Sequence, residues 1–215
     1  MVLTMHEAEI WHLDQKIQRT LAALEKNGFQ TFFVETKSEA LDKVLSLIPS
    51  NADVGVGGSV TIREINLIEA LTARGNMVFQ HWSQPEENVR AIMRKQLNSH
   101  VFVASSNAVT EDGKLVNIDK AGNRVAAMIF GPQKVIIVVG INKIVKNTDE
   151  GISRAKNVAG PMNARRRGDK TPCVTTGVCA DCEAPDRLCR VITIMEKKPS
   201  RTDVSVILIG ERLGF

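Results

Sequence analysis

The chain has 215 residues, of which 43% are hydrophobic and 24% charged, so it is long enough for one full domain with a buried core. No apolar run reaches the roughly 18 residues that a membrane span needs, and the N-terminal residues lack a signal-peptide pattern, which predicts a cytoplasmic protein. A net charge of +4 is only mildly basic, and an aromatic content of 4% provides few rings on which bases could stack. Nucleic acid is therefore not expected as a partner.

The hydrophobic pattern switches repeatedly between helical and strand periodicity. It begins with an amphipathic helix over residues 6–27, which ends at Asn27-Gly28. In chain order, further helices are expected at residues 38–48, 61–75, 85–99, 122–131 and 148–167. Strands are expected at residues 29–35, 53–58, 76–82, 100–106, 133–140, 190–196 and 203–211.

Local signals define several of these boundaries. Ser38 is expected to cap the second helix, and the Thr61-x-x-Glu64 pair predicts a capping box at the start of the third. Gly160-Pro161 predicts a break in the helix over 148–167. Residues 107–119 predict a β-hairpin that turns at Glu111-Asp112-Gly113.

The order of elements predicts the fold class. Alternating strands and helices with continuous apolar strands favour an α/β fold, in which an open, mostly parallel sheet has helices on both faces. The hairpin adds an antiparallel element, and the strand over 133–140 is apolar enough to be central. We expect a single domain over residues 1–215, with a cysteine-bearing insertion at about 163–190.

The glycine turn after the second strand is the first candidate ligand site. In open α/β sheets, ligands bind beyond the carboxyl ends of strands, at the turns that lead into helices. Glycines let the backbone approach a ligand and hydroxyls add polar contacts. The candidate residues are Gly57, Gly58, Ser59 and Thr61. The alternative is an ordinary glycine turn before a capped helix.

Two later strand ends supply further candidates. Asn107 and Glu111 follow one strand, and Asn142 and Lys143 follow the central one. Glu111 is a weak candidate for a catalytic carboxylate, acting as a general base or a nucleophile, although turn chemistry is the alternative in this segment and explains Asp112 better. Lys143 is placed to meet an anion, but an exposed lysine is the alternative.

All four cysteines fall in one short segment, as Cys173, Cys179, Cys182 and Cys189. In a reducing compartment, such clustering favours metal or redox chemistry over structural disulfides. Four thiolates from one loop are able to close around a [4Fe–4S] cluster or around Zn²⁺. We expect the cluster first, with zinc as the alternative and disulfides or free thiols as the third possibility.

Basic residues flank the cysteines on both sides. Four thiolates around either metal centre leave a net charge of about −2, which neighbouring cations would offset. The flanking residues are Arg165, Arg166, Arg167, Lys170, Arg187 and Arg190. The alternatives are an anion-binding or partner-binding surface and a plain solvated basic run.

Three stretches together resemble one protein family. These are VGVGGSVTIREINL (54–67), ASSNAVTEDGKLVNIDKAGNRVAAMIFGPQKVIIVVGINKIV (104–145) and AGPMNARRRGDKTPCVTTGVCADCEAPDRLC (159–189). The sequence looks like the LUD (lactate-utilisation, DUF162) family, in particular its cysteine-bearing subgroup. The resemblance implies a fold similar to the NagB/RpiA/CoA-transferase superfamily, in which ligands lie over such glycine turns. It also implies a link to an iron–sulfur system that oxidises lactate to pyruvate.

Three functional hypotheses follow from the residues and the resemblance. The first is a protein of lactate or organic-acid oxidation that binds a small anionic metabolite and transfers electrons through the cysteine site, alongside other subunits of a lactate-oxidising iron–sulfur system. The second is a CoA-transferase-like or isomerase-like enzyme with a structural metal, which would place a carboxylate such as Glu111 in the glycine-turn cleft. The third is a non-catalytic assembly subunit.

Overall fold

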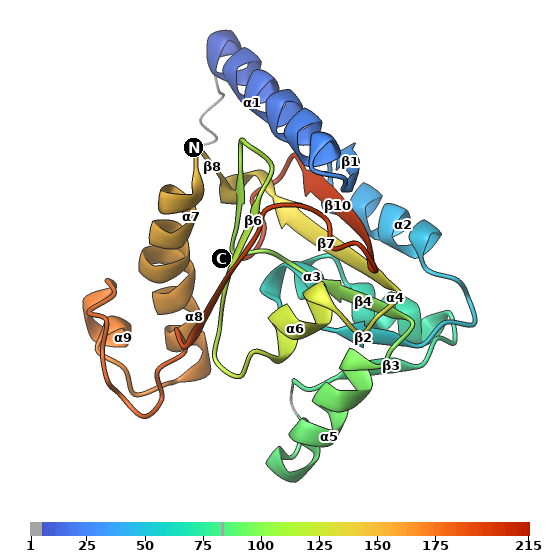
Figure 1. Ribbon diagram of the computed structural model, residues 1–215, viewed down its shortest axis with the longest axis vertical. Coiled ribbons are helices and arrows are strands. Elements are labelled where there is room, and N and C mark those ends of the chain that lie inside the picture. Colours follow the sequence, from blue (N-terminus) through green and yellow to red (C-terminus); the bar gives the residue numbers. More distant parts are fainter. Residues whose placement is uncertain (1–5, 83) are drawn as a thin grey trace.

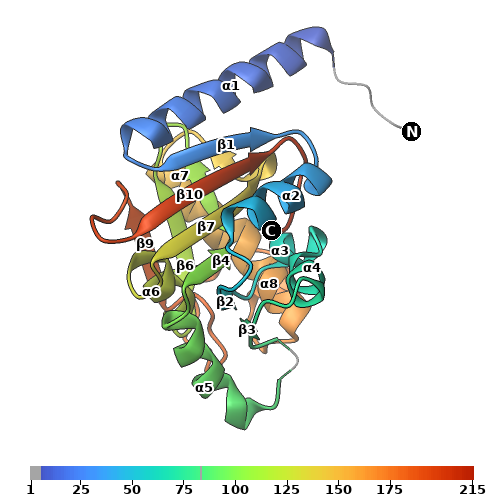
Figure 2. The ribbon, with the colours of Figure 1, turned by 90° about the vertical axis from the view of Figure 1, so that its right-hand side faces the viewer.

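Ten strands in two sheets carry the fold of the computed structural model, which describes residues 6–82 and 84–215 (Figure 1). The larger sheet has six strands, all parallel, in the order β1-β10-β7-β4-β2-β3. Figure 2 shows these strands side by side in that order. Their bounds are β1 Gln30–Val34, β10 Asp203–Ile209, β7 Lys134–Gly140, β4 Val101–Ala104, β2 Val54–Val56 and β3 Val78–Gln80. The predicted α/β class is confirmed, and β7 lies inside the sheet with neighbours on both sides, as expected.

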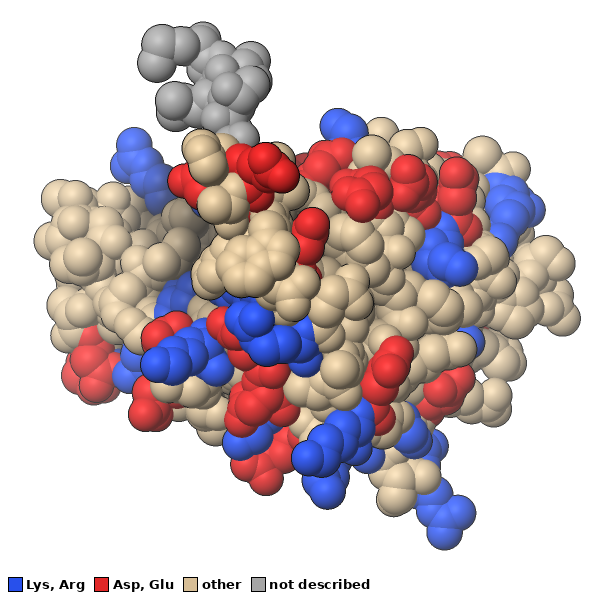
Figure 3. All heavy atoms as spheres, turned by 90° about the horizontal axis from the view of Figure 1, so that it is seen from above, with Lys and Arg blue, Asp and Glu red and all other residues tan. Residues whose placement is uncertain are grey.

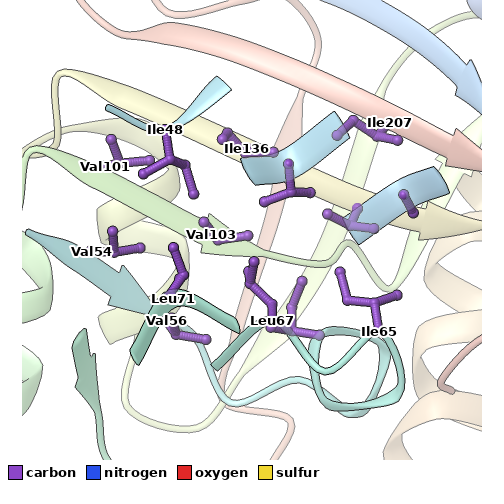
Figure 4. Packing of buried hydrophobic residues seen from close by; sticks show 14 of the residues in the cluster. Ile48, Val54, Val56, Ile65, Leu67, Leu71, Val101, Val103, Ile136 and Ile207 are labelled. Atoms are coloured by element: carbon purple, nitrogen blue, oxygen red, sulfur yellow. The ribbon is translucent and has the colours of Figure 1, made fainter. Parts of the chain in front are cut away.

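Helices cover both faces of this sheet because its strands are apolar on both faces. Ile136 and Val138 of β7 pack on one core, and their neighbours Val135, Ile137 and Val139 pack on the other. Successive side chains of a strand point to opposite faces of the sheet, so one strand contributes side chains to both cores. Figure 4 shows the first core, where the strands meet three helices. These helices are α2 Lys37–Leu47, α3 Val60–Glu64 and α4 Leu67–Ala73.

The second core is closed by helices and by the smaller sheet. That sheet has the order β8-β5-β6-β9, with β5 and β6 antiparallel as the hairpin prediction required. Its strands are β8 Ile144–Val145, β5 Ala108–Thr110, β6 Leu115–Asp119 and β9 Val191–Met195. The helices on this side are α1 Glu7–Lys26, α6 Asn123–Ile129 and α5 Glu86–Leu97, which also packs against β2 and β3 at the edge of the larger sheet.

A long interrupted helix lies against the smaller sheet, on the left in Figure 1. It consists of α7 (Thr148–Arg154), a π-helical turn η2 (Ala155–Ala159) and α8 (Gly160–Arg167). The predicted break near Gly160-Pro161 is therefore a widening of the helix. Proline has no N–H to donate and its ring clashes with the preceding turn, and the π turn absorbs both effects. The cysteine segment follows α8 and contains one short helix, α9 (Cys173–Thr176).

Two predicted helix starts are wrong by one or two residues. Thr36, rather than Ser38, caps α2, because its side chain accepts a hydrogen bond from the Glu39 N–H. Ser59, rather than Thr61, caps α3, because it has extended backbone and accepts from the Ile62 N–H. The helix expected over 61–75 is also divided into α3 and α4, at a left-handed residue in position 66.

None of the helices in residues 6–82 and 84–215 is long and apolar enough to cross a membrane.

A glycine in the turn between β5 and β6 tests whether this turn packs against the backbone of α1. Gly113 has φ +81°, and a Cβ built there would lie 2.5 Å from the Ala23 carbonyl carbon of α1. Gly75 has φ +89°, with no atom within 4 Å of a Cβ built there. We expect Gly75→Ala to lower the free energy of unfolding by about 1–2 kcal/mol through backbone strain alone. Gly113→Ala should lower it by roughly 3 kcal/mol or more, because the α1 backbone must also move.

Urea unfolding of the two variants measures this difference. An equal loss of stability in both would show that the hairpin does not pack against α1 as described.

Candidate functional site

An open cleft of about 840 Å³ lies beyond the carboxyl ends of β2, β3, β4 and the 3₁₀ turn η1 (Ile141–Lys143) that follows β7. The π turn η2 and α8 also line it. Because β7, β4 and β2 are parallel neighbours, their carboxyl ends meet at one edge of the sheet. Of the predicted binding residues, Gly58, Ser59, Thr61, Asn107 and Lys143 line this cleft.

Two predicted binding residues have packing roles instead, among the residues that the structure describes. A Cβ on Gly57 would lie 3.3 Å from Ala104 Cβ, so this glycine permits close packing behind the cleft wall. The Asn142 amide donates to the Gly214 carbonyl at 3.2 Å, and its Oδ1 accepts from the Leu213 N–H at 3.1 Å. Asn142 therefore fastens the C-terminal segment.

Glu111 lies outside the lining of the cleft. Its carboxylate pairs with Arg19 of α1 at 3.0 Å and lies 4.0 Å from Lys16 Nζ. These contacts join the hairpin turn to α1, so the structure places Glu111 in a link between the smaller sheet and a helix.

Lys143 is buried at the base of the cleft, with 3% of its surface exposed. Its Nζ donates to Thr61 Oγ1 at 2.8 Å and to Ser105 Oγ at 3.0 Å, so both partners in the described chain are neutral hydroxyls. Burial, aided by the nearby Arg154 and Arg124 cations, lowers the pKa of Lys143 from 10.5 to about 7. The ammonium and the free amine are thus both populated near neutral pH.

The pair Thr61 and Glu64, expected to form a capping box, holds the C-terminal segment over Lys143. The Glu64 carboxylate accepts from the Gly214 N–H at 2.7 Å, and Thr61 Oγ1 donates to the Leu213 carbonyl at 3.4 Å. The capping prediction fails because α3 is capped two residues earlier, by Ser59, and the side chains of Thr61 and Glu64 contact residues 213–214 instead. This contact spans about 150 positions in the sequence and left no local signal.

A buried arginine fixes the loops around Lys143. Arg124 uses all five of its N–H groups within the protein, and Asp119 at 3.0 Å balances its charge. Its acceptors are the Asp119 carboxylate, the Ser105 and Ile118 carbonyls, and the side-chain oxygens of Asn117 and Asn107. Arg124 therefore positions Ser105, whose hydroxyl holds Lys143, and has no N–H left for a ligand.

His81 presents one defined nitrogen near the glycine turn. The Gln96 amide nitrogen, which can only donate, shares its two N–H groups between the Val56 and Phe79 carbonyls and His81 Nδ1, and Nδ1 accepts at 3.1 Å. The neutral ring then carries its proton on Nε2, which lies 3.3 Å from a Cβ built on Gly58. Burial lowers the pKa of His81, which favours this neutral form.

Trp82 connects two elements that border the cleft. Its ring lies between the guanidinium groups of Arg63 of α3 and Arg166 of α8, at 4.1 Å and 4.2 Å from the ring centre. Such cation–π contacts are worth about 0.5–2 kcal/mol each. A side chain on Gly58 would collide with the Trp82 indole nitrogen, so the glycine turn gives this ring its space.

The cleft is strongly basic. Its described lining contains the basic residues Arg90, Lys120, Arg124, Lys143, Arg166, Arg167 and Arg190. The acidic residues are Glu86 and Asp119, and Asp119 is already paired with Arg124. By contrast, acidic and basic side chains are interspersed on the face shown in Figure 3. The lining of the cleft has an excess of positive charge, which favours an anionic ligand.

The four cysteines line one small hollow of about 20 Å³, beside Lys156 and Arg187. Cys189 also lines the large cleft, so the two spaces adjoin. Burial raises the pKa of the Cys189 thiol, and the neighbouring thiols add to the rise. Within residues 6–82 and 84–215, however, no three His, Cys, Asp or Glu side chains are arranged as a set of metal ligands.

Arg187 braces the cysteine loop from inside. It donates to the carbonyls of Cys182 at 2.5 Å and Cys189 at 2.9 Å, and it pairs with Asp181 at 2.6 Å. Of the three consecutive arginines in α8, Arg166 and Arg167 line the cleft rather than the cysteine hollow. Of the basic residues that the sequence analysis named as charge partners, Arg187 lines the cysteine hollow. Lys156, which the sequence did not single out, lines it as well.

The burial of Lys143 predicts a specific dependence of stability on pH. Its pKa is lower in the folded chain than in the unfolded chain, so its stability contribution rises with pH between about 7 and 10.5. Below pH 7 its burial costs on the order of 5 kcal/mol. Lys143→Met should therefore be more stable than the native protein at pH 6. The difference in the free energy of unfolding should be smaller at pH 9, where the native lysine is neutral.

Chemical unfolding at both pH values checks this expectation, with the exposed Lys146→Met as control. A gain that is the same at pH 6 and pH 9 would contradict the account of Lys143.

Comparison with known proteins places the chain in a family. No curated protein matches it in sequence. It is similar to the crystal structure of a DUF162 family protein from Deinococcus radiodurans, with a TM-score of 0.51 and 15% identity over 96% of this chain and 99% of that chain, a likeness that concerns the fold alone. A model described as the LUD domain matches residues 17–209. The match confirms the family resemblance, whereas the cysteine-bearing subgroup stays a prediction. The chain belongs to the LUD domain family.

Proposed function

We propose that this LUD domain protein binds a small carboxylate metabolite in the basic cleft, as part of lactate or related organic-acid oxidation. The family's association with lactate utilisation supports the metabolic setting. The observation that carries the proposal is the cleft lining, where basic side chains far outnumber acidic ones above a buried lysine without a carboxylate partner. An anion bound in the cleft would offset the excess positive charge of this lining.

The surroundings of Lys143 support a small and polar ligand. Thr61, Ser105, Ser106 and Asn107 line this end of the cleft and offer hydroxyl and amide groups. Such groups match the hydroxyl, carbonyl and carboxylate oxygens of an organic acid.

The CoA-transferase-like alternative has less support. It needs a free carboxylate in the cleft, and the described lining offers Glu86 at the start of α5 and Asp119, which Arg124 occupies. Glu111 lies in its link to α1. We therefore base the proposal on the basic residues.

We further propose that the four cysteines bind a [4Fe–4S] cluster, with Zn²⁺ as the alternative. The convergence of all four thiols on one hollow supports a shared centre, and Lys156 and Arg187 supply cations beside it. The Asp181 N–H already donates to Cys179 Sγ at 3.4 Å, which is the kind of contact that stabilises a thiolate. A cluster would supply one-electron transfer, and zinc would brace the loop.

The size of the hollow bears on the choice of metal. About 20 Å³ holds one water-sized occupant. Zinc fits with small adjustments, whereas a cluster requires the thiols to move apart. Among the described residues no ligand set for zinc or for a cluster is formed, so binding of either must rearrange the cysteine loop.

The binding proposal predicts that Arg166 contributes to affinity. We expect L-lactate or pyruvate to bind the protein, and Arg166→Gln to weaken binding by about tenfold, since a charge-assisted contact is worth about 1.5 kcal/mol. Isothermal calorimetry at low salt measures both values.

Arg165→Gln is the matched control, because Arg165 is exposed on the same helix and lines neither the cleft nor the hollow. Equal weakening by both variants would point to general electrostatics. If sugar phosphates or CoA esters bind and both organic acids fail to, the proposed ligand class is wrong.

The metal proposal predicts the content of anaerobically purified protein. We expect broad visible absorption and about four irons per chain, or one zinc ion if the alternative holds. Replacing Cys182 by serine should lower the metal content and destabilise the loop, because each thiolate is a ligand.

Serine at Val178, an exposed position in the same loop, is the control and should keep the metal. Protein that contains neither iron nor zinc after anaerobic purification and reconstitution would overturn the proposal.

A further inference from the structure

We propose that the Lys143 amine attacks the carbonyl carbon of a 2-oxo acid bound in the cleft and forms an imine with it. This inference rests on the proposed function, because the same cleft must first bind a small carboxylate. It adds a chemical role for Lys143 and narrows the ligand to acids with a neighbouring carbonyl group, which are the products of 2-hydroxy acid oxidation.

The first argument is the availability of the amine. An imine-forming lysine must present a free lone pair, whereas an ordinary exposed lysine is almost entirely protonated at neutral pH. Lys143 is 3% exposed and has only hydroxyl partners in the described chain. The adjacent guanidinium groups of Arg154 and Arg124 further disfavour the ammonium form. The Glu64 carboxylate raises the pKa of Lys143, but its effect is smaller than those of burial and of the two guanidinium groups.

The second argument is orientation. Thr61 and Ser105 hold Nζ at 2.8 Å and 3.0 Å, and all three residues line the cleft. Ser105 is itself fixed, because its carbonyl accepts from Arg124 at 2.8 Å. A buried amine fixed by two hydroxyls meets a bound carbonyl in one orientation, which is the main requirement for a fast addition.

The third argument is the proton path. The Ser105 hydroxyl has only a long contact, 3.4 Å, to the Ser106 carbonyl as donor, so it is free to donate to an oxygen that develops beside Nζ. Thr61 lies on another side of the same nitrogen. These hydroxyls are suited to pass protons between the amine nitrogen and the departing oxygen.

The step balances without an oxidant or a reductant. The nitrogen lone pair forms the N–C bond while the carbonyl π pair moves to oxygen, which yields a carbinolamine. The nitrogen lone pair of the carbinolamine then forms the C=N double bond as the C–O bond breaks, and the oxygen leaves as water with the two protons that the neutral amine carried. The ligand carboxylate takes no part in this exchange and is held by the basic lining of the cleft.

Borohydride trapping tests the proposal. The protein is incubated with pyruvate as the 2-oxo acid probe, reduced with borohydride and examined by intact mass and peptide mapping. We expect a mass gain of one pyruvic acid less one oxygen atom, located on the peptide that contains Lys143. The trapping rate should rise with pH around a midpoint near 7.

Two variants and one control make the result specific. Lys143→Arg keeps a positive charge but forms no imine, so trapping at this site should vanish. Lys146→Arg changes an exposed lysine three residues away and should trap as the native protein does. Thermal unfolding of each variant verifies that it is folded.

The outcomes separate the imine from the proposed function. Pyruvate that binds by calorimetry without labelling Lys143 would overturn the imine and leave the binding proposal standing. Absence of binding by both L-lactate and pyruvate would overturn the binding proposal itself. Labelling spread over surface lysines, unchanged in Lys143→Arg, would also overturn the imine.

Discussion

The burial of one lysine at the carboxyl end of the central strand organises this end of the molecule. Lys143 reaches the cleft only because β7, β4 and β2 are adjacent and parallel, so that the residues following each strand meet at one edge. Thr61 follows β2, Ser105 follows β4, and their hydroxyls hold the ammonium nitrogen. Without these two contacts, a buried lysine would lack partners for its N–H groups, which is costly in a low-dielectric interior.

The surrounding network keeps that arrangement rigid while leaving the lysine free of a counter-ion. Arg124 spends its five N–H groups on the loops after β4 and on β6, and Asp119 neutralises it. Among the other basic residues of the cleft, Arg167 pairs with Asp169 at 3.0 Å, whereas the partners of Lys143 are the two hydroxyls. The cysteine hollow adjoins this space through Cys189, so a metal bound in the hollow would lie beside any ligand bound in the cleft.

The sequence predicts the parts of this site that depend on local patterns. The ends of strands and the glycine turns can be predicted from hydrophobic periodicity, and this pattern indicates Gly58, Thr61 and Lys143 as binding residues. All three line the cleft. The roles of Thr61 and Arg124 did not follow, because their partners come from distant segments of the chain. The Trp82 contacts with Arg63 and Arg166 were missed for the same reason, since three separate elements supply them.

The central claim is that burial in a basic cleft lowers the pKa of Lys143 far enough to populate its free amine near neutral pH, and its titration tests this most directly. Nuclear magnetic resonance of protein with isotope-labelled lysine side chains resolves each Nζ, and Lys143→Arg assigns the signal. The account predicts a midpoint at about pH 7 for Lys143. A midpoint at the ordinary value of 10.5 would contradict it.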